Sequence, residues 1–129
     1  MSKSLARVVA ALEAAGVETE VKEMAAETRT AEQAAAAAGC ATDQIVKSII
    51  FRGNESGEVL LFLTAGGNRV SDEKASSLAG EPLGKADAAL IRERTGFAIG
   101  GVSPVGHLLP VRSFLDPRLM EFSQVWAAA

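Results

Sequence analysis

The hydrophobic residues near the start of the chain repeat with the spacing of one helical face: Leu5, Val8, Val9 and Leu12. Gly16 follows them, so the pattern predicts a first helix that buries one stripe and ends at this glycine. The next residues, VETEV at 17–21, alternate between apolar and polar. Alternation of this kind predicts a strand after the helix.

An alanine-rich run over residues 31–38 comes next. Thr30 and Gln33 have the spacing of a capping box at its start, and Gly39 supplies the left-handed residue that ends a helix. Alanine has the highest helix propensity, and its short side chain lets two backbones approach each other. We therefore expect a helix that packs closely against a sheet.

Two hydrophobic runs occupy the middle of the chain, IVKSIIF at 45–51 and EVLLFLT at 58–64. The RGNESG segment between them has the Asn and Gly residues of a turn, which predicts a pair of antiparallel strands. Both runs are apolar on both faces, so we expect them to be the central strands of a sheet.

Polar caps and glycines divide the second half of the chain into further elements. Ser71 is placed to cap a helix over 72–79, and Asp87 a helix over 88–95 that Gly96 ends. The GEPLGKAD segment reads as a loop with a short strand, and Asp116 followed by a proline opens another helical turn.

Strands are also predicted on both sides of a glycine-rich loop, FAIGG at 97–101 and HLLPVRSFL at 107–115. No linker and no internal repeat separates the elements, so residues 1–129 are expected to form a single domain. Helices interleaved with hairpin-connected strands indicate an α/β (α+β) fold, with a mixed, largely antiparallel central sheet surrounded by helices.

Composition agrees with a globular domain of ordinary solubility. Hydrophobic residues make up 48% of the 129 positions and charged residues 22%. No apolar run approaches the roughly 20 residues that a membrane span needs. The basic start of the chain carries Glu13 and amphipathic spacing, which indicates a helix and not a signal peptide. We expect a cytoplasmic protein.

The net charge of −3 argues against a protein that coats nucleic acid by neutralising phosphates, although it allows a short contact. The basic residues either gather on one face or are scattered over a solvated surface, and the scattered arrangement is favoured: Arg52, Arg69, Lys74, Lys85, Arg92, Arg94, Arg112 and Arg118. The chain has one cysteine, Cys40, and one histidine, His107, so we expect no disulfide, no zinc site and no metal.

Lys47 interrupts an otherwise hydrophobic strand. Alternation places it on the same face as Ile49 and Phe51, and neither face of this strand looks solvated. Two interpretations are open. The lysine either extends along the protein surface to solvent at the end of the strand, or it reaches into a pocket where its ammonium meets an anion.

The segment TGFAIGGVSPVGH at 95–107 is either a tight turn or a loop that holds a ligand against the main chain. Ser103 and His107 suggest a nucleophile and base, but the second glycine of the G-x-S-x-G elbow is missing and no acid is placed to orient the histidine. A thiol dyad of Cys40 and His107 is less favoured than a structural cysteine. The AGGNR segment at 65–69 does not match the phosphate-binding P-loop.

Four segments taken in order resemble the YbaK/ProX-like prolyl-tRNA editing family: QIVKSIIF at 44–51, LFLTAGGNRVSDEK at 61–74, TGFAIGGVSPVGH at 95–107 and FSQVWAAA at 122–129. The resemblance implies a fold like the editing domain inserted in some bacterial prolyl-tRNA synthetases. It also implies a cofactor-free, trans-acting aminoacyl-tRNA deacylase, which hydrolyses the ester of tRNA(Pro) mischarged with a small amino acid. Its implied partners are the 3′ end of that tRNA and prolyl-tRNA synthetase.

The same resemblance implies Lys47 as the catalytic lysine, which would anchor the terminal phosphate or ribose. The substrate-binding residues that it implies are Thr64, Gly100, Gly101, Val102, Ser103, Pro104, Gly106 and His107. In a glycine-rich loop, backbone N–H groups, that of Gly101 among them, can donate to the ester carbonyl as it gains negative charge. No protein nucleophile is implied, because such enzymes position water or let the substrate's own 2′-hydroxyl or side chain assist.

The resemblance also implies that relatives continue past Ala129 with a further strand and a helix. A non-catalytic module that binds aminoacyl-tRNA or a small ligand is the alternative function, and a small-molecule esterase is a weaker one. The amino acid removed stays open among alanine, cysteine, 2-aminobutyrate, serine and threonine. One methylene in a pocket is worth only about 1 to 3 kcal/mol, which a sequence pattern does not resolve.

Overall fold

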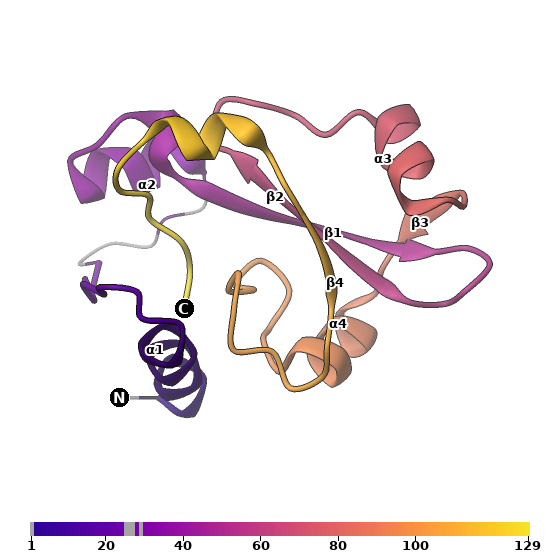
Figure 1. The fold of residues 1–129 in the computed structure, drawn as a ribbon, viewed down its shortest axis with the longest axis horizontal. Coiled ribbons are helices and arrows are strands. Elements are labelled where there is room, and N and C mark those ends of the chain that lie inside the picture. The colour runs from indigo at the N-terminus through magenta and orange to yellow at the C-terminus, as the bar shows by residue number, and fades with distance from the viewer. Residues whose placement is uncertain (1, 25–27, 29) are drawn as a thin grey trace.

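A computed structural model describes residues 2–24, 28 and 30–129. Its centre is a four-stranded sheet of order β3-β1-β2-β4, formed by β1 (Val46–Gly53), β2 (Val59–Ala65), β3 (Leu83–Lys85) and β4 (Arg112–Leu115) (Figure 1). β1 pairs with β2 and with β3 in antiparallel fashion, whereas β2 and β4 are parallel. The two hydrophobic runs are therefore the central strands of a mixed sheet, as predicted.

The helices begin and end close to their predicted positions: α1 (Lys3–Ala14), α2 (Ala31–Ala38), α3 (Asp72–Ala79), α4 (Ala88–Thr95) and two 3₁₀ turns, η1 (Thr42–Gln44) and η2 (Pro117–Glu121). The Thr30–Gln33 capping box is formed, and Ser71 and Asp87 accept hydrogen bonds from the first turns of α3 and α4. These caps satisfy orphan N–H groups that lie a few residues away in sequence, which makes them predictable.

The two faces of the sheet are covered by different parts of the chain, on opposite sides of the sheet in Figure 1. On one face, which we call the α3 face, Ile49, Leu60 and Phe62 pack against Ala75 of α3. On the other, the loop face, Ile50 of β1 packs on a core made by α1, α4 and the segment after α4: Val8, Ala86, Ile91, Phe97 and Val102. Burying such side chains stabilises the fold by about 1.5–3 kcal/mol each.

Four predicted features differ from the structure. Of the strand predicted over 107–115, only Arg112–Leu115 (β4) forms. The VETEV residues form no strand, and Val17 and Val21 are each 50% exposed. FAIGG turns, because the Gly101 N–H donates to the Ala98 carbonyl at 3.0 Å, and it has no neighbouring strand to pair with. In α2, Ala35 is buried and the helix packs against η1 instead of lying flat on the sheet. Alternation and propensity describe a segment, and its partner is set by the tertiary fold.

Candidate functional site

The glycine loop, residues 97–107, lies on the loop face and connects α4 to β4. Gly106 has a φ of 78°, and a Cβ at this position would lie 3.1 Å from the backbone of Arg7 and Val8 in α1. Gly100 has a φ of 85°. Gly101 differs from both, since its φ is not positive and a Cβ would meet only the Ala98 carbonyl oxygen at 3.8 Å. Folding therefore requires Gly106 and Gly100, and it does not require a glycine at 101.

Arg7 holds the glycine loop against α1. Its Nε donates to the Gly106 carbonyl at 3.2 Å, and its Nη2 donates to the Gly96 carbonyl at 3.0 Å. The guanidinium also stacks over the Phe97 ring, 5.1 Å from the centroid. One side chain thus fixes both ends of the loop. Sequence reasoning missed Arg7, and the only signal for it was a charged residue directly before the buried Val8 of an amphipathic helix.

Ser103 and His107 close the loop internally. Ser103 is completely buried, and its hydroxyl accepts from the Val105 N–H at 3.2 Å. The His107 Nε2 lies 2.7 Å from the Ser103 carbonyl oxygen, which can only accept, so Nε2 carries a proton and donates it to this carbonyl. The buried hydroxyl agrees with the rejection of a serine nucleophile. The imidazole contacts Phe97 edge to face and not Cys40.

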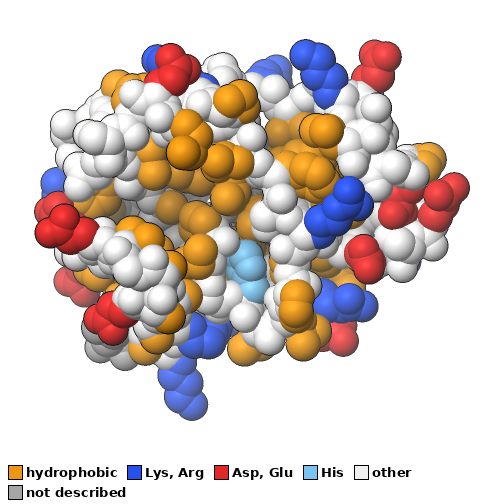
Figure 2. All heavy atoms as spheres, in the orientation of Figure 1, with side chains coloured by type: hydrophobic (Ala, Val, Ile, Leu, Met, Phe, Trp, Pro, Cys, Tyr) orange, Lys and Arg blue, Asp and Glu red, His pale blue; other side chains and the backbone are white. Residues whose placement is uncertain are grey.

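The backbone donors of the loop fall into two groups. The N–H of Gly101, which we expected to donate to an ester, is already bonded to Ala98, and Val102 is 3% exposed. Five at least partly exposed residues of the loop have N–H groups without a partner in the described part of the chain: Ala98, Ile99, Gly100, Gly106 and His107. Hydrophobic side chains surround the single histidine in the middle of the face shown in Figure 2. The available donors are therefore on other residues of the loop and not on Gly101.

Lys47 lies elsewhere. It is half-buried and opposite Thr64 in the β1–β2 ladder, and its Nζ donates to the Asn68 carbonyl at 2.5 Å. Thr64 is buried, and its hydroxyl donates to the Phe62 carbonyl at 3.1 Å. The ammonium thus has a main-chain partner, which neither of the two sequence interpretations included.

The alternation of β1 places Lys47 and the glycine loop on different faces of the sheet. Lys47 shares the α3 face with Ile49, whereas the loop packs on Ile50 across the sheet. Of the site residues predicted from sequence, Lys47 and Thr64 lie opposite each other in the β1–β2 ladder, and all the others lie in the glycine loop. The resemblance lists the Lys47 segment and the glycine loop together, but the pleat of β1 directs Lys47 to the face opposite the loop. Their functional roles stay predictions.

The turn after β2, residues 65–68, carries the carbonyl that holds Lys47, and we call it the Gly-Gly turn. Asp116 Oδ2 accepts from the Ala65 N–H at 3.1 Å and from the Asn68 Nδ2 at 2.9 Å. Asp43 Oδ1 accepts from the Gly67 N–H at 2.8 Å. A Cβ at Gly66 would overlap the Thr42 carbonyl of η1. The glycines of AGGNR therefore serve close packing in this turn.

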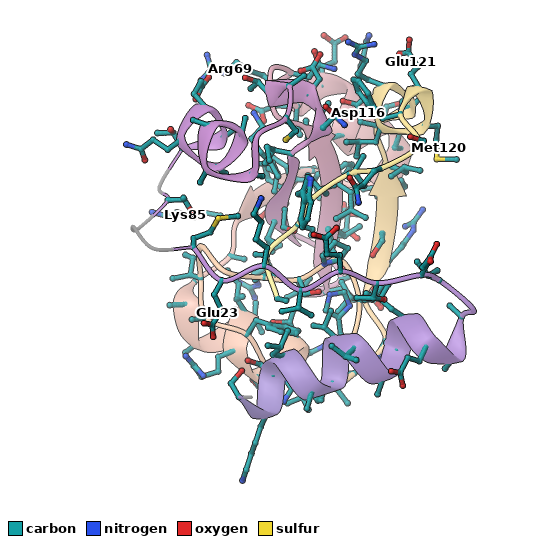
Figure 3. All side chains as sticks on the ribbon, turned by 90° about the vertical axis from the view of Figure 1, so that its left-hand side faces the viewer. Glu23, Arg69, Lys85, Asp116, Met120 and Glu121 are labelled. Atoms are coloured by element: carbon teal, nitrogen blue, oxygen red, sulfur yellow. The ribbon has the colours of Figure 1, made fainter. Side chains whose placement is uncertain are left out.

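Arg118 links the two carboxylates of this region. Its Nε donates to Asp43 Oδ2 at 3.0 Å, and its backbone N–H donates to Asp116 Oδ1 at 2.9 Å. Figure 3 shows Asp116 beside η2, on the same side of the molecule as Arg69 and Glu121. Hydrogen bonds from Arg118 and Gly67 lower the pKa of Asp43. Burial opposes ionisation of Asp116, but bonds from Asn68, Arg118 and Ala65 lower its pKa nonetheless.

A cavity of about 360 Å³ borders the Gly-Gly turn on the α3 face. Its lining residues include Phe62, Thr64, Asn68, Arg69, Lys74, Leu78 and Phe114.

In the described residues no group of three or more His, Cys, Asp or Glu side chains is arranged to hold a metal. No helix of the described chain is both long enough and apolar enough to cross a bilayer.

A family model of aminoacyl-tRNA editing domains matches residues 25–129. The chain belongs to the aminoacyl-tRNA editing domain family. It is 33% identical over 111 residues to the uncharacterised protein YwhH of Bacillus subtilis (strain 168), a match that covers 86% of this chain and 70% of YwhH. The family assignment made from four sequence segments is thereby confirmed.

Two crystal structures show the same architecture. One is of a protein described as a candidate trans-editing enzyme for prolyl-tRNA synthetase, with 49% identity, a TM-score of 0.88 and coverage of 99% of this editing domain and 81% of that chain. The other is of the hypothetical protein APE2540, with 30% identity, a TM-score of 0.84 and coverage of 95% and 81%. The mixed-sheet fold expected from the resemblance is confirmed, and an aminoacyl-tRNA editing role is supported.

Proposed function

We propose that this editing domain is a trans-acting deacylase that hydrolyses the ester of tRNA(Pro) carrying a small, wrongly attached amino acid. Membership of the editing family supports the reaction class, and the 49% identical candidate trans-editing enzyme for prolyl-tRNA synthetase supports the choice of tRNA. The observation that carries the proposal is Gly101, whose missing side chain has no explanation in the fold. A substrate backbone or ester that approaches the loop closely would explain it. The proposed setting is the cytoplasm, where tRNA is charged.

Hydrolysis of the ester needs a nucleophile and a place for negative charge. Water, assisted by the vicinal hydroxyl of the terminal ribose, attacks the carbonyl carbon, and the carbonyl oxygen becomes an oxyanion. The unpartnered N–H groups of Gly100, Gly106 and His107 are suited to stabilise it, because they are fixed by the Arg7 clamp before the substrate arrives. The carbon–oxygen bond to the ribose then breaks, the ribose oxygen takes a proton from the attacking water, and free amino acid and tRNA leave.

Lys47 has a different part in this proposal. An ammonium has three donors, and the Asn68 carbonyl takes one of them. The other two can bind a phosphate of the 3′ end where that strand passes the end of the sheet. Lys47 thus anchors the nucleotide on the α3 face, while the ester is held on the loop face.

The proposal is tested with a panel of tRNA(Pro) charged separately with alanine, cysteine, 2-aminobutyrate, serine, threonine and proline. We expect release of one or more of the first five and protection of prolyl-tRNA(Pro). Tight binding of the panel without release of any amino acid would favour the non-catalytic module. A tRNA of another identity charged with the same amino acid measures how far the tRNA body contributes.

A further inference from the structure

The Asn68 carbonyl that holds Lys47 is fixed from several directions. The Asn68 N–H donates back to the Ala65 carbonyl at 2.9 Å, which closes the Gly-Gly turn. Asp116 holds the turn at Ala65 and at the Asn68 side chain, and Asp43 holds it at Gly67. A carboxylate that accepts backbone and amide N–H bonds forms some of the stronger hydrogen bonds found in proteins.

Asp116 accepts more hydrogen bonds than capping η2 alone requires. Asp116 Oδ1 already caps η2 through the Arg118 N–H, as an aspartate before a proline commonly does. The second oxygen, Oδ2, turns toward the Gly-Gly turn and accepts two further hydrogen bonds there. Lysine has a long, flexible stem, so its ammonium has a defined position only where a fixed acceptor meets it. Asn68 supplies that acceptor at 2.5 Å from Nζ.

We propose that Asp116 and Asn68 are positioning residues for Lys47, acting through the Asn68 carbonyl. Asp116 orients the Asn68 side chain and Ala65, the turn then presents its last carbonyl to β1, and the ammonium is directed along one line with two donors left for a phosphate. The catalytic consequence rests on the proposed function, whereas the effect on the ammonium itself does not.

Kinetics test the proposal through the variants Asp116→Asn and Asn68→Asp and the double variant that carries both. Asp116→Asn places two amides side by side, and Asn68→Asp places two carboxylates side by side. The double change restores an amide–carboxylate pair with the two groups exchanged. We expect kcat/KM to fall on the order of 10-fold in each single variant, since a misplaced group costs up to about 100-fold. The double variant should recover part of that loss.

Asp87→Asn is the matched control, because it makes the same chemical change at the cap of α4, away from the Gly-Gly turn. We expect its kcat/KM to stay within twofold of the starting protein, and the circular dichroism of all variants to remain that of a folded domain. Single variants that match the control, or a double variant slower than both singles, would overturn the proposal.

A second measurement needs no turnover. Brief treatment with an amine-acetylating reagent, followed by peptide mass spectrometry, gives the modification rate of Lys47 relative to the exposed Lys85. Asp116→Asn and Asn68→Asp should raise that ratio several-fold by loosening the Nζ bond, and Asp87→Asn should leave it unchanged. An unchanged ratio in both single variants would refute the positioning role. If no charged tRNA is hydrolysed but the ratio rises, the proposed function fails while the positioning of Lys47 stands.

Discussion

Two pairs of adjacent glycines, Gly66–Gly67 in the Gly-Gly turn and Gly100–Gly101 in the glycine loop, look alike in sequence and differ in their surroundings. Side chains at the first pair would collide with the Thr42 carbonyl and with the Asp43 carboxylate, whereas a Cβ at Gly101 would make only an ordinary contact with the Ala98 carbonyl oxygen, at 3.8 Å. The first pair is demanded by packing. In the second pair the positive φ of Gly100 explains the glycine, whereas no backbone angle or neighbouring atom explains the glycine at 101. What a Cβ would meet therefore separates structural glycines from candidate substrate contacts.

The largest expected effect is on the lysine that the Gly-Gly turn serves. Lys47→Ala should reduce deacylation by more than about 100-fold, because the phosphate loses its anchor and the ester is no longer held in a reactive position. The fold should survive, since Lys47 is half-buried and its acceptor is a main-chain carbonyl. Single-turnover deacylation together with urea unfolding measures both quantities. Full turnover by a folded variant would remove Lys47 from the mechanism.

Gly101→Val should lower the rate of deacylation by roughly 100-fold, comparable to the loss of an oxyanion donor. The valine side chain would occupy the space through which the ester approaches. Its free energy of unfolding should change by less than about 1 kcal/mol, because no neighbour has to move. The contrast sharpens with Gly101→Ala, which should give a smaller loss of rate. If Gly101→Val is as active as the unchanged protein, the glycine loop does not face the substrate.

Gly66→Ala should show the opposite behaviour. The new methyl group would overlap the Thr42 carbonyl, so the free energy of unfolding should fall by about 1–3 kcal/mol, as in other overpacked sites. Urea unfolding of Gly66→Ala and Gly101→Ala side by side is the direct comparison of the two regions. Equal stability of these two variants would remove the distinction drawn between them.

Sequence reasoning succeeded where a structure depends on residues close in the chain. The capping box at Thr30, the caps at Ser71 and Asp87 and the β1–β2 hairpin all satisfy their hydrogen bonds locally. It failed where the partner is remote. Arg7 donates to the Gly106 carbonyl, 99 positions away. The FAIGG residues were predicted as a strand and form a turn instead, because no strand lies beside them in the described chain.

The placement of Lys47 relative to the glycine loop could not be derived from local patterns. Alternation placed Lys47 with Ile49 correctly, but no local pattern tells which face of a sheet a distant loop will cover. Asp43, Asp116 and Asn68 were missed for a related reason. Each is an ordinary loop or cap residue by its local sequence, and their common position at the Gly-Gly turn arises only from the tertiary fold.

Acid should weaken the Gly-Gly turn before it affects the glycine loop. The pKa values of Asp43 and Asp116 are below their usual value of 3.8 in the folded protein, so their contribution is fully present above that pH and is lost as the pH falls through the lowered values. The free energy of unfolding should therefore decrease more steeply between pH 5 and 2 in the unchanged protein than in Asp43→Asn or Asp116→Asn. Parallel curves for all three would show that these carboxylates are not linked to folding.

The smallest effect concerns salt, and it follows from how the cations of the two regions are used. Several already hold main-chain carbonyls, carboxylates or rings: Arg7, Lys22, Lys47, Arg112 and Arg118. The basic side chains of the described chain without such contacts are spread over α1, α3, α4, β1, β3 and the segment before α3: Lys3, Arg52, Arg69, Lys74, Lys85, Arg92 and Arg94. They form no single stripe along one element.

With a net charge of −3 and the uncommitted basic residues of the described chain spread over several elements, the editing domain should hold only the aminoacylated 3′ end. Each phosphate contact on a single strand contributes a slope of about 0.7 in the salt dependence of binding, so about one to three contacts predict a shallow dependence. The measurement compares deacylation of an acceptor-stem minihelix with that of full-length tRNA(Pro) across a salt series. We expect similar kcat/KM for both substrates and a small slope. A slope equivalent to about six or more contacts, or a nearly inactive minihelix, would instead show that these residues make an extended tRNA surface, because only phosphates beyond the 3′ end could supply so many charges.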